Sequence, residues 1–119
     1  MLRLRQAVEA RGSRFAVAVI NATEEVAERR WNWTLYANPA LKAFRWDRDK
    51  PNRLITGFLA RRGIATIPLL EVFRAHMKET NTSGFYEWDV HWAPTGHALA
   101  ADAMARGLVA LELVPKPAH

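Results

Sequence analysis

Asp89 and His91, separated by one residue, are the side chains of this sequence best suited to catalysis. A carboxylate two residues before a histidine, in a loop after an extended segment, can accept a hydrogen bond from the imidazole Nδ1–H. That contact fixes the tautomer of the ring and stabilises the imidazolium. Nε2 is then free to act as general base on a serine hydroxyl and later as general acid. The spacing therefore predicts the acid–base part of a Ser-His-Asp triad.

A longer pattern surrounds this pair, from Tyr86 to Ala101 (YEWDVHWAPTGHALAA). Asp-x-His-Trp is followed, after a short Ala-Pro-Thr spacer, by Gly96-His97 and then by a helix of small residues. This combination resembles the C-terminal catalytic block of SGNH (GDSL-type) hydrolases. Residues 47–73 also resemble, more loosely, the approach to that block. The resemblance therefore covers essentially the whole chain but only the later part of the family domain.

The resemblance implies a flavodoxin-like three-layer α/β/α fold and hydrolysis of esters through an acyl-serine intermediate. It implies that Asp89 is the acid that orients the histidine and that His91 is the base. The family nucleophile lies in a Gly-Asp-Ser motif, and its oxyanion hole uses an Asn from a Gly-x-Asn-Asp motif; this sequence contains neither motif. The two serines of the chain, Ser13 and Ser83, and the strand-terminal Asn21 stand in different contexts.

The hydrophobic periodicity predicts alternating helices and strands. The expected elements are a helix at 2–11, a strand at 15–20, a helix at 24–30 capped by Thr23, a helix from 49 to 63, a strand at 64–70, a helix at 71–78 and a helix from 94 to about 113. Strands that alternate with helices are typical of a parallel sheet with helices on both faces. The sequence therefore predicts the α/β class.

Two strands are too few for a complete sheet of this kind. Parallel strands are normally buried on both faces, as the apolar run at 15–20 (FAVAVI) indicates, whereas a two-stranded sheet exposes its edges. We therefore expect residues 1–119 to be the C-terminal part of a single SGNH hydrolase-like domain, with its N-terminal half absent from the chain. The missing half is the expected partner, and the expected substrate is a small-molecule or carbohydrate ester.

The segment 31–48 has the least regular pattern. Its aromatic residues, interleaved with polar residues and Pro39, are Trp31, Trp33, Tyr36, Phe44 and Trp46. We expect a covering loop with about one turn of helix, whose rings pack as a lid on the core; an aromatic wall for substrate is the alternative. Downstream, we expect Phe85–Trp88 to be extended and Trp88 and Trp92 to pack the catalytic loop.

The other histidines have structural explanations. His97 is expected to open the last helix near the pair, His76 to lie at the surface or boundary of a helix, and His119 to lie in a tail. Asp89, His91 and His97 have suitable ligand types for a metal ion. No further ligand stands at suitable spacing, so the sequence predicts neither a metal ion nor a cofactor.

Composition narrows the classes of partner. The net charge is +5, but the cations are mostly arginines interleaved with acids, which indicates a solvated basic surface and no nucleic-acid partner. The chain has no cysteine, which excludes disulfides, thiolate metal sites and a cysteine nucleophile. No apolar run approaches the length of a bilayer, so no membrane span is expected in this chain.

Two other hypotheses stay open. Asp-x-His-Trp also resembles the block of alginate-type O-acetyltransferases of the SGNH superfamily, in which the serine lies downstream. Residues 92–119 contain no serine, and Gly96-His97 fits the hydrolase pattern better. The other alternative is a non-catalytic α/β domain that pairs with another polypeptide through its exposed sheet edges.

Overall fold

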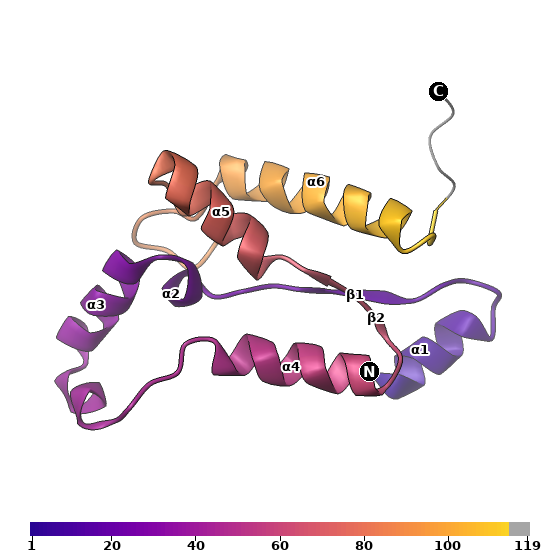
Figure 1. Cartoon of the computed structure of the whole chain (residues 1–119), viewed down its shortest axis with the longest axis horizontal. Helices are drawn as coiled ribbons and strands as arrows, with labels where there is room; N and C mark the ends of the chain where they lie inside the picture. The colour runs from indigo at the N-terminus through magenta and orange to yellow at the C-terminus, as the bar shows by residue number, and fades with distance from the viewer. Residues whose placement is uncertain (115–119) are drawn as a thin grey trace.

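The computed structural model describes residues 1–114 as a mixed helical and stranded chain. Its elements, shown in Figure 1, are α1 (Leu2–Glu9), β1 (Ala16–Val19), α2 (Thr23–Val26), α3 (Glu28–Ala37), the 3-10 helix η1 (Pro39–Ala43), α4 (Lys50–Arg61), β2 (Ala65–Pro68), α5 (Leu70–Thr80) and α6 (Pro94–Ala110). The expected alternation of helices and strands is confirmed. The predicted tail, with His119, lies outside the described residues.

β1 and β2 pair in parallel, and the register places Val19 opposite Pro68. Successive side chains of a strand point to opposite faces of the sheet. Val17 and Val19 therefore join a cluster with Leu59 of α4, whereas Ile67 of β2 joins the cluster that includes α6. Figure 1 shows the sheet between α4 and α6. This three-layer arrangement confirms parallel strands with flanking helices.

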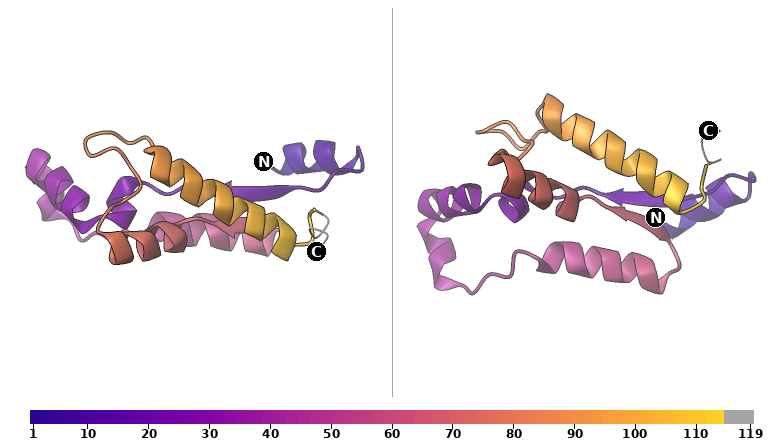
Figure 2. Two further views of the ribbon diagram at one scale, coloured as in Figure 1. Left: turned by 90° about the horizontal axis from the view of Figure 1, so that it is seen from above. Right: turned by 45° about the horizontal axis from the view of Figure 1, so that its top comes forward.

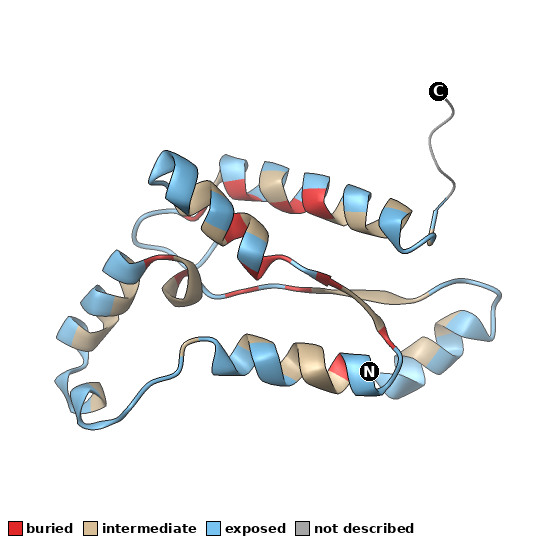
Figure 3. Cartoon of the chain, in the orientation of Figure 1, coloured by how far each residue is buried: buried red, intermediate tan, exposed pale blue. Residues whose placement is uncertain are grey.

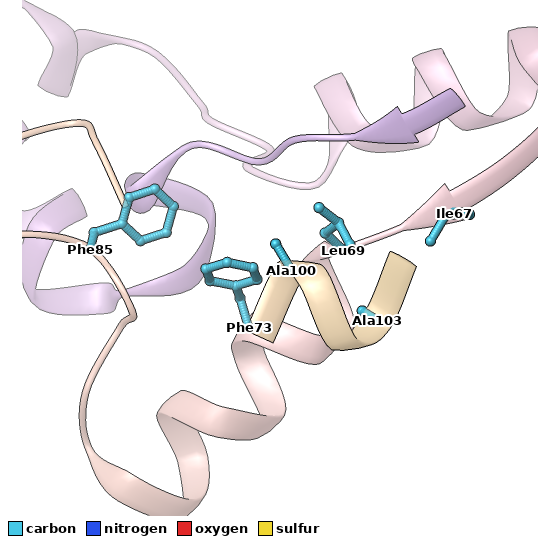
Figure 4. Close-up of a cluster of buried hydrophobic side chains, with 6 residues drawn as sticks. All are labelled: Ile67, Leu69, Phe73, Phe85, Ala100 and Ala103. Atoms are coloured by element: carbon cyan, nitrogen blue, oxygen red, sulfur yellow. The ribbon is translucent and has the colours of Figure 1, made fainter. Parts of the chain in front are cut away.

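The larger hydrophobic cluster joins β2, α5, α6 and the loop between the two helices. It consists of Ile67, Leu69, Phe73, Phe85, Ala100 and Ala103 (Figure 4). The side chains of Leu69 and Phe73 are completely buried. Buried positions concentrate where β2 leads into α5 and on the facing sides of α5 and α6, while α1 and α3 have none (Figure 3). The core therefore supports the connection between α5 and α6.

Gly107 allows α6 to lie directly on β2. A Cβ atom at this position would lie 2.9 Å from two side-chain carbons of Ile67, which is closer than van der Waals contact. The buried Ala100 and Ala103 share this side of α6, at the spacing that places residues on one helix face. Small residues on one face thus set the short distance between α6 and the sheet.

The prediction that the strand at 15–20 is buried on both faces is wrong. Only Val19 is buried within β1, and the adjacent Ile20 is 68% exposed. β1 has one neighbouring strand, β2, among the described residues, so its opposite edge is open. Both faces of a strand are covered only when the sheet and its helices extend beyond it on each side.

The covering loop expected at 31–48 is also wrong, because α3 and η1 occupy most of its first thirteen residues. Residues 28–37 contain neither glycine nor proline, and Glu28 lies in the first turn, where the helix dipole favours an acid. The rings do not form a lid on the core. Tyr36 and Phe44 are 77% and 65% exposed, and Trp33 and Trp46 are also exposed.

The helix expected at 24–30 is divided at Ala27, which is extended, so α2 and α3 are separate elements. Thr23 is the first residue of α2, so it is not the capping residue. The N-terminus is instead closed by Glu25, whose Oε2 accepts a hydrogen bond of 2.8 Å from the backbone N–H of Ala22. A glutamate at this position commonly closes the first turn of a helix in this way.

Candidate functional site

The candidate site lies on the loop between α5 and α6, at the end of the sheet where both strands finish. β1 leads into α2 and β2 leads into α5, so the carboxyl ends of the strands point toward these two helices. Figure 2 shows the loop at the α2–α3 end of the molecule in both views. In open α/β sheets, ligands bind in the crevice outside the carboxyl ends of the strands.

The loop is closed on itself by an isolated antiparallel bridge between Phe85 and Trp92. The backbone N–H of Tyr86 donates to the carbonyl of His91 at 3.1 Å, and that of Ala93 donates to the carbonyl of Gly84 at 2.9 Å. The extended segment predicted for Phe85–Trp88 is therefore wrong beyond its first residues. Because Phe85 and Trp92 pair, the chain must reverse direction between them, and residues 87–91 form turns and bends.

Aromatic stacking fixes the base of the loop to the core. The ring of Trp92 stacks on the ring of Phe73 with 5.5 Å between their centroids. The ring of Phe85 also lies against the ring of Phe73, again with 5.5 Å between centroids. The edge of the His97 ring meets Trp92, also at 5.5 Å. The packing role predicted for Trp92 and the position of His97 at the start of the last helix are thus confirmed.

Gly84 and Gly96 allow the loop to cross the start of α6. A Cβ atom on Gly96 would lie 2.1 Å from the carbonyl oxygen of Gly84, which no side chain can occupy. Gly84 itself has φ of +77°, in the left-handed region that favours glycine. The structure therefore explains the glycine of the Gly96-His97 pair: without a side chain at this position, the backbone of the loop can pack directly on the start of α6.

Asp89 and His91 form the pair that the sequence predicts. One carboxylate oxygen of Asp89, Oδ1, is hydrogen-bonded to Nδ1 of His91 and also accepts the backbone N–H of His91 at 2.9 Å. Both contacts stabilise the ionised carboxylate, the backbone N–H foremost, and they hold the pKa of Asp89 below its usual range. When Nδ1 donates to Asp89, the lone pair lies on Nε2, which is the tautomer that a general base needs.

The pair is open to solvent. The side chain of His91 is 79% exposed and that of Asp89 is 53% exposed. Within residues 1–114, no hydrogen bond joins His91 to a serine hydroxyl. Ser83 accepts the backbone N–H of Phe85 at 3.3 Å, and Ser13 lies after α1. The arrangement provides an oriented base, but the described residues give it no nucleophile.

A pocket of about 360 Å³ lies between α3 and the loop, and the sequence analysis did not predict it. Residues of the two elements that line the pocket also contact each other: Arg29 pairs with Glu87 at 3.0 Å, and the rings of Trp33 and Trp88 meet edge to face at 5.8 Å. Trp88 was expected to pack the loop, but it is 65% exposed and contacts α3 instead. No local signal could have found these pairs, because 58 residues separate Arg29 from Glu87.

Asn21, directly after β1, is the other residue whose environment the sequence did not predict. It is 3% exposed, and neither polar atom of its side-chain amide has a hydrogen-bond partner among the described residues. Its position after an apolar strand was the available signal. His76 lies at the boundary of its helix, one of the two expected positions, because it is partly buried, and its Nε2 lies 3.0 Å from the hydroxyl of Thr82.

Comparisons of the chain with family models, with curated proteins and with solved structures found no match. Among the described residues, no helix combines the length and the apolar character that crossing a membrane requires. Residues 1–114 also contain no cluster of three or more histidine, aspartate or glutamate side chains that could hold a metal ion. The function must therefore be inferred from the geometry of the site.

Proposed function

We propose that Asp89 and His91 are the acid–base pair of an SGNH-type serine esterase whose nucleophile lies on a polypeptide segment outside residues 1–119. The observation that carries the proposal is the double hydrogen bond to Oδ1 of Asp89, from Nδ1 and from the backbone N–H of His91. It orients the ring so that Nε2 points away from the carboxylate. An orienting acid of this kind holds the base of a hydrolytic triad in the productive tautomer.

In this reaction, Nε2 of His91 takes the proton of the incoming serine hydroxyl as its oxygen attacks the ester carbonyl. The imidazolium that forms is stabilised by the ionised Asp89, whose low pKa keeps it charged. The same proton then passes to the departing alcohol. Water, deprotonated by His91, next attacks the acyl-serine. The imidazolium then returns this proton to the departing serine oxygen, which releases the carboxylic acid and restores both the serine hydroxyl and the neutral base.

The open surfaces of the chain support the proposal that another polypeptide segment completes the site. β1 and β2 have one strand neighbour each among the described residues, and an open edge is a template for another strand. The exposed face of His91 leaves room for a serine hydroxyl. Acyl transfer works best in a site that excludes water, which an added segment would provide.

The test combines labelling and sequencing. A fluorophosphonate, which reacts with activated serines, is expected to leave the 119-residue chain unlabelled at both Ser13 and Ser83. The DNA upstream of the Met1 codon, translated in three frames, is expected to encode a Gly-Asp-Ser motif after a strand. Labelling of either serine in the chain alone would overturn the proposal that the nucleophile lies outside residues 1–119. Absence of any such upstream motif would favour the non-catalytic, partner-dependent domain.

A further inference from the structure

The pocket between α3 and the catalytic loop has the composition of a binding site. One wall comes from α2 and α3, with Arg29, Arg30 and Trp33, and the other from the loop, with Glu87 and Trp88. Its volume of about 360 Å³ is within the range of small-molecule sites. Trp88 immediately precedes Asp89, so a group bound here lies on the loop that carries the acid–base pair.

Both arginines that line the pocket lie in ion pairs, one of them with a carboxylate outside the lining, so their charges are already balanced. Arg29 pairs with Glu87 at 3.0 Å, and Arg30 pairs with Glu24 at 3.3 Å while its guanidinium lies 4.7 Å from the centre of the Trp33 ring. A carboxylate or phosphate ligand would meet the negative charge of Glu87, and a cation would meet the two arginines. The balance therefore favours a neutral ligand over either charged class.

The remaining polar groups both donate and accept hydrogen bonds. Asn81, Thr82 and Ser83 line the pocket together with Glu87 and Arg29. An aliphatic group would desolvate these atoms without replacing their hydrogen bonds, which costs free energy. Hydroxyl groups donate and accept at the same atom, so a ring with several hydroxyls matches this mixture. The exposed rings of Trp33 and Trp88 offer apolar area to the C–H face of such a ring.

We propose that this pocket binds a neutral, polyhydroxylated ring such as a sugar. Its identification with the alcohol part of the ester rests on the proposed function, whereas the binding itself does not. The ring would lie against the exposed surface that Trp33 and Trp88 form together, with its hydroxyls directed to the polar residues at 81–83 and to Glu87.

The experiment is an NMR titration of the 119-residue chain with methyl β-glucopyranoside, observing the indole N–H signals. The signals of Trp33 and Trp88 are expected to shift and that of Trp46 to stay, since Trp46 does not line the pocket. Trp88→Ala is expected to weaken binding about five- to tenfold. Trp46→Ala, a matched change of another exposed tryptophan that contacts aromatic rings, should leave it unchanged.

Benzoate and 1-butanol serve as the anionic and aliphatic probes. Shifts of Trp33 and Trp88 with either of these but not with the glucoside would overturn the proposal, and so would no shift with any probe. Signal dispersion of the indole region checks that each variant is folded. Because the titration needs no nucleophile, its failure leaves the acid–base pair intact, and a failed esterase test leaves the binding result intact.

Discussion

One carboxylate oxygen organises the candidate site at the residue scale. Oδ1 of Asp89 receives two donors from His91, and these contacts span only two residues of sequence. Such a local hydrogen bond follows from residue type and spacing, which is why the sequence predicts this contact. The pocket contacts of Trp88 and Glu87 depend on the placement of α3, which spacing along the chain cannot provide.

We expect Asp89→Asn to change the pH dependence of stability. The pKa of Asp89 is lowered in the folded chain, so its contribution to stability is present above the ordinary carboxyl pKa and is lost as pH falls through the lowered value. The effect is small because the group is exposed. Urea unfolding should find the wild type more stable than the variant at neutral pH, with a smaller difference at pH ~3, below the ordinary carboxyl pKa. An equal difference at both pH values would contradict this account.

Gly96→Ala should displace the loop that carries Asp89 and His91 from α6. The added Cβ would lie 2.1 Å from the carbonyl oxygen of Gly84, and overpacking of this kind typically costs about 1–3 kcal/mol. The free energy of unfolding, measured in urea, should fall by that amount. Thr95→Ala, an exposed neighbour on the same helix turn, is the control and should change it by less than ~0.5 kcal/mol. Equal effects of the two substitutions would be inconsistent with the close contact.

Element type followed from sequence where apolar periodicity and glycine stops were clear, as in α4, β2, α5 and α6. Gly63, with φ of +61°, ends α4 where the sequence analysis expected. α3 was missed because its aromatic residues do not form an apolar stripe facing the core, and no residue of α3 is buried. A helix that exposes its rings carries no periodic signal, so only its lack of glycine and proline indicated it.

The close packing of α6 on β2 can be tested with two glycine substitutions. In Gly107→Ala the new Cβ would lie 2.9 Å from Ile67, so the helix must move away from the sheet, and we expect about 1–3 kcal/mol of destabilisation. In Gly57→Ala of α4 the Cβ meets only the end of the flexible Arg61 side chain, at 3.3 Å. That variant should be up to ~1 kcal/mol more stable, since alanine favours helix. Urea denaturation of both variants provides the comparison, and a stabilising Gly107→Ala would refute the close packing.

The whole molecule is less compact than a complete domain of its length. The radius of gyration is 16.8 Å, against about 13.5 Å from the scaling of compact domains with chain length. The accessible surface is 8550 Å², against roughly 6500 Å² for a monomer of this mass. The excess is comparable with the area that an obligate protein interface buries. The two-stranded sheet predicted from sequence explains it, because the described strands and helices leave edges uncovered.

We therefore expect the isolated chain to be weakly stable. Its free energy of unfolding should lie below the ~5 kcal/mol that is the lower end for native domains. Urea unfolding measures this value, and sedimentation velocity at increasing concentration should show association through the open surfaces. A monomer at all concentrations, with a cooperative transition in the normal range, would show that residues 1–119 are self-sufficient.

The most direct test of the central claim is ester hydrolysis by the protein made from the complete reading frame that encodes residues 1–119. We predict that this protein hydrolyses p-nitrophenyl acetate and that His91→Ala lowers kcat by roughly 10³-fold or more, since the base is then lost. The change should leave the fold intact, because His91 is exposed. Equal kcat values for the wild type and His91→Ala would contradict the assignment of His91 as the catalytic base.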